Sequence, residues 1–214
     1  MIYIIISIDP STTFLTEIVE RLTSEKIEMI KIEVQPSKDP YVKELEIIKN
    51  IPDYSTIIFL GHGQSGILWG GESSEIKKRE LVDSREMKIF NNKNLFLLAC
   101  DSAKLLRGSL LNFKLLKSIG FGGLPTETYE IESSKKLLER GVTHEVLDEF
   151  KNAIIETVSD AFIYYLNSKC DDFYKLRDYL SLLINKRINK AVLEDNNRKL
   201  ADLLFEMRNE MAIY

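Results

Sequence analysis

Two short apolar runs constrain the fold of this chain more than any other feature. The first spans Ile57 to Leu60 and continues into Gly-His-Gly with His62 at its centre, and the second spans Leu95 to Leu98 and continues to Cys100. Unbroken apolar runs of this length are typical of strands buried on both faces, as in a parallel sheet. In an open parallel sheet, functional side chains gather outside the carboxyl ends of the strands. The two runs therefore predict neighbouring strands that bring an imidazole and a thiol to one edge, the arrangement of an activated sulfur nucleophile.

Strand and helix patterns alternate along the first part of the chain. This order predicts an α/β fold with a doubly wound, mostly parallel sheet. From about residue 134 onward the apolar spacing is helical. We therefore expect an α/β core over residues 1–132 and a helical C-terminal part over residues 133–214 packed on it. The expected strands cover residues 1–8, 28–34, 55–60, 95–99 and 118–121, and the expected helices cover residues 14–25, 42–51, 103–117 and 193–211.

Residues 64–90 have the weakest periodicity of the chain. The apolar triplet at 67–69 favours a short strand, and the glycine pair at 70–71 favours a turn. Residues 72–80 are rich in charge and are expected to be exposed, whereas residues 82–90 favour a short helix.

Charge and composition argue against several classes of function. The 214 residues carry a net charge of −4 with both signs interspersed, which argues against a nucleic-acid surface spread over the whole chain but leaves a local patch open. No apolar run approaches the about 20 residues that span a bilayer. The apolar N-terminus lacks a basic leader and a cleavage site, so it favours a first strand over a signal peptide. The two cysteines, Cys100 and Cys170, lie far apart, so a reducing cytoplasm is expected and a disulfide framework is not.

The motifs at the two strand ends resemble those of the caspase-like cysteine peptidases. In that group one apolar strand ends in His-Gly and a later one in Ala-Cys-x-Ser; here these are residues 62–63 and 99–102. The chain is most similar to the bacterial CHAT peptidases, whose strands end in Gly-His-Gly and Ser-Ala-Cys. Leu98 stands where that motif has its serine. Residues 118–125 occupy the place of a Trp-Pro-like element but lack the tryptophan.

The resemblance implies a fold and an activity. The fold would be a caspase-like three-layer sandwich with a mostly parallel sheet and a C-terminal helical extension. The activity would be that of a cysteine endopeptidase that cuts a protein substrate through a His62–Cys100 dyad, without metal or cofactor and under the control of a protein partner. Small bacterial relatives often belong to defence or cell-death systems, an association that follows from the family alone.

The residues themselves suggest how such a dyad would work. A nearby histidine takes the proton of a thiol, or stabilises the thiolate, and later protonates the leaving amine. The oxyanion of the tetrahedral intermediate needs donors, for which the backbone N–H groups of Gly63 and Cys100 are the candidates. Caspase-like enzymes generally lack a strict third member, so none is nominated.

Substrate preference is expected to depend on Asp9 and Leu98. In caspase-like enzymes the first pocket uses a residue after the first strand and one two places before the cysteine, which correspond to these positions. Asp9 would pair with a basic P1 side chain, but it is explained at least as well as a turn or helix-cap residue before Pro10. Leu98 adds no charge, so a basic preference does not follow from this pair.

Purely structural roles are alternatives to each of these functional assignments. A cysteine that closes a strand is usually a small hydrophobe, and a histidine after a strand is often a turn residue. His144 follows a plausible helix cap and is expected to be structural, and Cys170 is expected to be inert. The principal alternative to a peptidase is a catalytically inactive caspase-like interaction module. A more distant one is a flavodoxin-like ligand-binding or signalling domain with an incidental cysteine.

Overall fold

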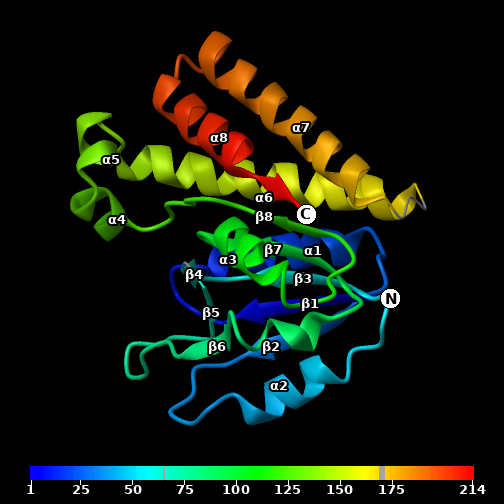
Figure 1. Ribbon diagram of the computed structural model, residues 1–214. Coiled ribbons are helices and arrows are strands. Elements are labelled where there is room, and N and C mark those ends of the chain that lie inside the picture. Colours follow the sequence, from blue (N-terminus) through cyan, green and yellow to red (C-terminus); the bar gives the residue numbers. More distant parts are fainter. Residues whose placement is uncertain (65, 169–171) are drawn as a thin grey trace. The chain divides into compact units, whose positions relative to one another are not determined.

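The computed structural model describes residues 1–64, 66–168 and 172–214 (Figure 1). Cys170 therefore lies outside the described residues. The chain forms two compact units that interleave along the sequence. The first contains Met1–Thr16, Glu28–Gly122 and Met211–Tyr214, and the second contains Glu17–Ile27 and Gly123–Glu210. The sequence predicted a single boundary after residue 132. In the structure, residues 17–27 belong to the second unit although they precede that boundary, and the last four residues belong to the first unit although they follow it.

A six-stranded sheet forms the centre of the first unit. Its order is β2-β1-β3-β7-β8-β9, in which β9 alone runs antiparallel to its neighbour. The mixed α/β class and the mostly parallel sheet are thus as expected from the sequence. The direction of winding reverses between β1 and β3, which is where open α/β sheets bind ligands. The strands are β1 (Ile2–Ser7), β2 (Ile30–Val34), β3 (Thr56–Leu60), β7 (Asn94–Leu98), β8 (Ser118–Gly120) and β9 (Ala212–Ile213).

The three central strands are buried on both faces, as their unbroken apolar runs predict. On one face Ile5, Phe59 and Leu97 are at most 1 % exposed, and on the other Ile58 and Phe96 are fully buried. Successive side chains of a strand point to opposite faces. An apolar residue at every position is therefore what a strand covered on both sides requires.

Short helices complete the first unit. Ile48 of α2 (Val42–Lys49) and Leu105 and Leu106 of α3 (Ser102–Ser109) belong to the same buried cluster as the odd-numbered residues of the central strands. Two short 3₁₀ helices, η1 (Thr13–Leu15) and η2 (Met87–Phe90), lie in the connections. The helix expected over 103–117 is wrong in its second half: α3 ends at Ser109, and Leu111 is 96 % exposed. The apolar residues of 110–116 therefore do not continue one buried helical face.

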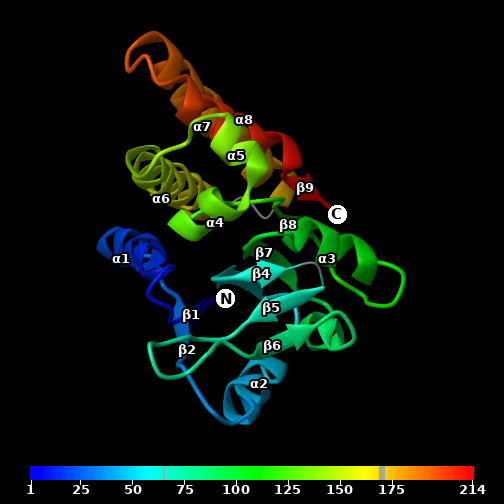
Figure 2. The same ribbon diagram turned by 90° about the vertical axis from the view of Figure 1, so that its left-hand side faces the viewer.

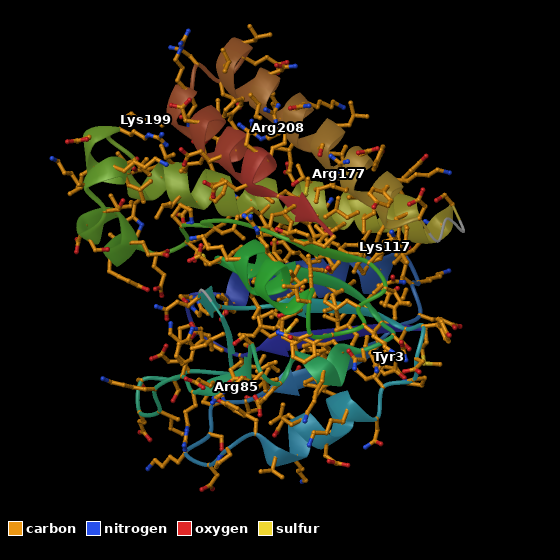
Figure 3. All side chains as sticks on the ribbon, viewed as in Figure 1. Tyr3, Arg85, Lys117, Arg177, Lys199 and Arg208 are labelled. Carbon is orange, nitrogen blue, oxygen red and sulfur yellow. The ribbon has the colours of Figure 1, made fainter. Side chains whose placement is uncertain are left out.

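The irregular stretch after β3 folds into a second, antiparallel sheet. Figure 2 shows its strands β4 (Gly63–Gln64), β5 (Ile67–Trp69) and β6 (Glu80–Asp83) side by side. The strand at 67–69 is confirmed, but the helix expected over 82–90 is wrong in its first part. Val82 is fully buried and pairs with β5. Asp83 then ends the strand, because its side chain accepts hydrogen bonds from the backbone N–H groups of Arg85 (2.7 Å) and Glu86 (3.1 Å). Figure 3 labels Arg85, which lies in this turn.

The second unit is helical. Within it α7 and α8 lie side by side in both ribbon views (Figures 1 and 2). The helix expected over 193–211 begins later, at Arg198, because α7 continues to Leu193 and the side chain of Asn197 accepts the N–H of Leu200 at 3.0 Å. Among the described residues, no helix combines the length and the apolar character that crossing a membrane requires. The helices are α1 (Thr16–Ser24), whose first residue belongs to the first unit, α4 (Thr128–Ser133), α5 (Lys135–Glu139), α6 (His144–Asn167), α7 (Phe173–Leu193) and α8 (Arg198–Glu210).

Candidate active site

The two strands that carry the sequence motifs are neighbours. β3 and β7 pair in parallel with Leu60 opposite Leu98. The N–H of Gly61 extends this pairing with a hydrogen bond of 3.3 Å to the carbonyl of Leu98. His62 and Cys100 each follow two residues beyond the last matched pair, so both chains leave the same edge of the sheet in step. The predicted adjacency of the two strands is confirmed.

Gly63 brings the two motifs into direct backbone contact. A Cβ atom at this position would overlap the carbonyl oxygen of Cys100 and would lie 2.9 Å from the Cβ of Ala99. Real Cβ atoms essentially never come this close to another heavy atom. Only glycine therefore permits the chain after His62 to lie against the peptide of Cys100.

Cys100 itself lies in a sharp turn between β7 and α3. The strand ends at Leu98, and the helix begins at Ser102 after Asp101 has adopted a left-handed conformation with φ of 56°. The N–H of Asp101 donates to the carbonyl of Gly122 at 2.8 Å, which holds the turn. Cys100 is partly exposed and forms no disulfide within the described part of the chain. The turn thus leaves Cys100 partly exposed directly after β7.

The imidazole of His62 is held by residues that follow the first strand. Its Nε2 lies 2.6 Å from Oγ of Ser11 and 3.5 Å from Oδ1 of Asp9. Ser11 in turn donates to Oδ1 of Asp9 twice, from its hydroxyl at 2.6 Å and from its backbone N–H at 2.8 Å. The His62 side chain is only 13 % exposed, so the network is largely shielded from solvent.

Asp9 is a buried carboxylate that its surroundings keep ionised. Its relative exposure is 3 %, and its Oδ2 atom has no hydrogen-bond partner among the described residues. Burial by itself raises the pKa of Asp9. The two hydrogen bonds from Ser11 and the nearby charges of His62 and Lys78 outweigh burial, so that the pKa lies below its ordinary value. The sequence predicted a role for Asp9 in substrate binding, and the structure places it next to His62.

The backbone N–H of Gly63, predicted as an oxyanion donor, is left out of the pairing between β4 and β5. The N–H of Trp69 donates to the carbonyl of His62 at 3.1 Å, and Gly63 is opposite Leu68 across β4 and β5. Hydrogen-bonded and non-hydrogen-bonded pairs alternate along antiparallel strands. The Gly63–Leu68 pair is therefore a non-hydrogen-bonded one, and the N–H of Gly63 points away from β5.

Leu98 and Ser102, which flank the cysteine motif, are both buried. The Leu98 side chain is 2 % exposed at the end of β7, and its role in a substrate pocket stays a prediction. The Ser102 hydroxyl donates to the carbonyl of Leu97 at 2.7 Å and accepts the N–H of Phe121 at 2.9 Å. Ser102 therefore joins β7 to the chain that follows β8, which explains a serine at this place of the motif.

Ser11 is the residue of this site that sequence reasoning missed. Its local pattern is that of a turn, because serine after proline is common in turns. The sequence did contain a signal, the Asp-Pro-Ser triplet directly after the first strand. Because β1 lies beside β3, with Ile6 opposite Leu60, the residues that follow these two strands meet at one edge of the sheet.

Sequence comparisons add no relative. No family model and no curated protein matches the chain. The likeness to caspase-like peptidases thus remains a likeness of the two strand-end motifs. The expectation that the site works without a metal or cofactor stays a prediction.

Proposed function

We propose that this protein is a cysteine endopeptidase of the caspase-like, CHAT type, with His62 and Cys100 as its catalytic dyad. One observation carries the proposal. The two residues leave adjacent parallel strands in step, and Gly63 packs directly on the peptide of Cys100. A thiol and an imidazole delivered together to the carboxyl edge of a parallel sheet are the parts that nucleophilic catalysis by cysteine requires.

The proposed reaction proceeds through a thioester. His62 accepts the proton of the Cys100 thiol, and the sulfur attacks the carbonyl carbon of the scissile peptide bond. The N–H groups of Gly63 and Cys100 stabilise the resulting oxyanion. The C–N bond then breaks as the imidazolium returns its proton to the leaving amine. Water, deprotonated by His62, hydrolyses the thioester and releases the carboxylic acid and the thiol.

The remaining features of the proposal follow the motif resemblance. The substrate is a protein, and a regulatory protein partner controls access to the site. Leu98 contributes to the pocket for the residue before the scissile bond, and the protein acts in the cytoplasm, as part of a bacterial defence system. The fold is a caspase-like three-layer sandwich with a helical C-terminal extension.

The experiment compares cleavage and alkylation in three variants. Cys100→Ala and His62→Ala should each abolish hydrolysis in a proteome-wide cleavage assay, because the first lacks the nucleophile and the second its base. Cys170→Ala is the matched control, since it removes the only other thiol of the chain and should retain the wild-type rate. Iodoacetamide should modify Cys100 in the wild type, and more slowly in His62→Ala.

Two results would overturn the proposal. One is a Cys100→Ala variant that cleaves at the wild-type rate. The other is a wild-type protein that cleaves no substrate and whose Cys100 resists alkylation. The second result would favour the alternative, a catalytically inactive interaction module.

A further inference from the structure

We propose that Ser11 and Asp9 form a hydrogen-bonded relay that holds His62 with its proton on Nε2, leaving Nδ1 as the base for Cys100. This inference rests on the proposed function for its catalytic meaning, but the protonated nitrogen can be measured without catalysis. Neither residue touches the reacting atoms in this scheme. Both are positioning residues that act through His62.

The direction of the relay follows from counting protons. The Ser11 hydroxyl has a single proton, and its oxygen lies 2.6 Å from Oδ1 of Asp9 and 2.6 Å from Nε2 of His62. An ionised carboxylate only accepts hydrogen bonds. The hydroxyl proton must therefore lie between Ser11 and Asp9, and the serine oxygen then accepts a proton from Nε2.

The opposite direction is unfavourable. If Ser11 donated its proton to Nε2, its oxygen would face Oδ1 of Asp9 at 2.6 Å with no proton between two acceptors. A protonated Asp9 would remove that conflict. However, the hydrogen bonds from Ser11 and the nearby charges hold the pKa of Asp9 below its ordinary value despite burial, so the ionised form prevails at neutral pH.

The relay is built on a fixed piece of backbone. The carbonyl of Asp9 accepts the N–H of Thr12 at 3.1 Å and the hydroxyl of Thr13 at 2.9 Å. The preceding residue, Ile8, donates to the carbonyl of Val34 at 3.0 Å, which continues the β1–β2 pairing. The carboxylate is therefore presented from the end of β1, next to the strand that carries His62.

The position of the carboxylate shows how Asp9 would act on the histidine during the reaction. When His62 takes the proton of Cys100, its ring becomes positively charged with Nε2 3.5 Å from Oδ1 of Asp9. The Asp9 carboxylate is buried, and its Oδ2 has no hydrogen-bond partner among the described residues, so its negative charge is little screened by solvent. Asp9 then compensates that charge, and the proton on Nε2 remains where it is.

The decisive test is the tautomer of His62 by nitrogen NMR of the imidazole ring. The chain has only two histidines, so a His62→Ala spectrum assigns the signals. Near pH 8 we expect the wild type to carry its proton on Nε2, and Ser11→Ala to lose this single tautomer and become a mixture. Ser11→Thr keeps the hydroxyl and should restore it. Thr16→Ala is the control and should change nothing, because among the described residues its hydroxyl bonds only to the carbonyl of Thr13.

Kinetics supply the second readout. Ser11→Ala should lower kcat/KM by about tenfold or more, with most of the loss in kcat, because an unoriented imidazole is a poorer base. Ser11→Thr should recover most of the rate. A wild-type His62 protonated on Nδ1, or an unchanged tautomer in Ser11→Ala, would overturn the relay while leaving the dyad intact. A Cys100→Ala variant that still cleaves would refute the peptidase, and the tautomer measurement would still decide the relay.

Discussion

At the scale of single residues, the contact between the two motifs depends on the missing side chain of Gly63. We predict that Gly63→Ala abolishes cleavage and lowers the free energy of unfolding by about 1–3 kcal/mol, as overpacking typically does. The added methyl group would meet the carbonyl of Cys100 and the Cβ of Ala99, and neither is the flexible end of a side chain. Chemical denaturation and the cleavage assay measure the two effects.

Gly108 is the matched control for this substitution. It lies within α3, and a Cβ atom there would meet nothing within 4 Å. Gly108→Ala should therefore leave cleavage unchanged and stabilise the protein by about 0.5–1 kcal/mol, because alanine is the better helix former. If Gly63→Ala behaves like Gly108→Ala, the two motifs are not held together as described.

At the scale of elements, the buried hydroxyl of Ser102 fastens β7 to the chain after β8. Ser102→Ala would leave the N–H of Phe121 and the carbonyl of Leu97 without this partner in a fully buried place. We predict a loss of about 1–3 kcal/mol in the free energy of unfolding, the usual penalty for an unsatisfied buried polar group. Denaturant titration of the purified variant measures it.

Ser109 provides the comparison from the same helix. It is as buried as Ser102, at 1 % exposed, but within the described part of the chain its hydroxyl bonds only to the carbonyl of Leu105, four residues earlier. A serine bonded back onto its own helix contributes little to stability, so Ser109→Ala should be nearly neutral. Equal losses in both variants would show that Ser102 does not join the two strands.

The sequence predicts elements well where burial alone determines them. The central strands match their apolar runs closely, because a strand covered on both faces needs an apolar residue at every position. The helix predicted over residues 82–90 is wrong in its first part, since a short apolar run fits a helix and a strand equally well and only pairing with β5 decides. The two-residue β9 gave no pattern to detect, because its strand state depends on its pairing with β8.

The candidate site shows the same limit. His62 and Cys100 could be found because a buried strand leads to each. Ser11 could not, because serine in a turn carries the same local signal whether it caps a helix or holds a histidine. Its role depends on β1 lying beside β3, which is a property of the topology and not of the local sequence.

At the scale of the whole molecule, no single cut along the chain separates the two compact units. Residues 17–27 of the second unit lie between β1 and β2 of the first, and the chain returns to the first unit for its last four residues. There Tyr214 and Ser118 exchange two backbone hydrogen bonds of 2.9 Å beside β8. A fragment that ends near residue 132 therefore lacks a strand of the main sheet.

The stability of the whole chain should decrease toward acid pH, because carboxylates in both units have lowered pKa values in the folded state. In the second unit, burial raises the pKa of Glu206, but ion pairs of 2.7 Å with Lys136 and Arg140 outweigh it and bring the pKa below its ordinary value of 4.5. In the first unit Asp9 is lowered below its ordinary 3.8. The unfolded chain then binds protons at a higher pH than the folded one, so these groups stabilise the fold above their ordinary pKa values.

This stabilisation should be lost as pH falls through the ordinary pKa of Glu206 and on through its lower folded value. We predict that the melting temperature decreases from neutral pH to about pH 3, and that Glu206→Gln is less stable than the wild type at neutral pH but has a flatter acid slope. Glu139→Gln is the control, because Glu139 and its partner Lys135 are 67 % and 89 % exposed and such surface pairs contribute little. The melting temperature of Glu139→Gln should change with pH in the same way as that of the wild type. A Glu206→Gln variant with the full wild-type acid slope would mean that its two ion pairs do not distinguish the folded from the unfolded chain.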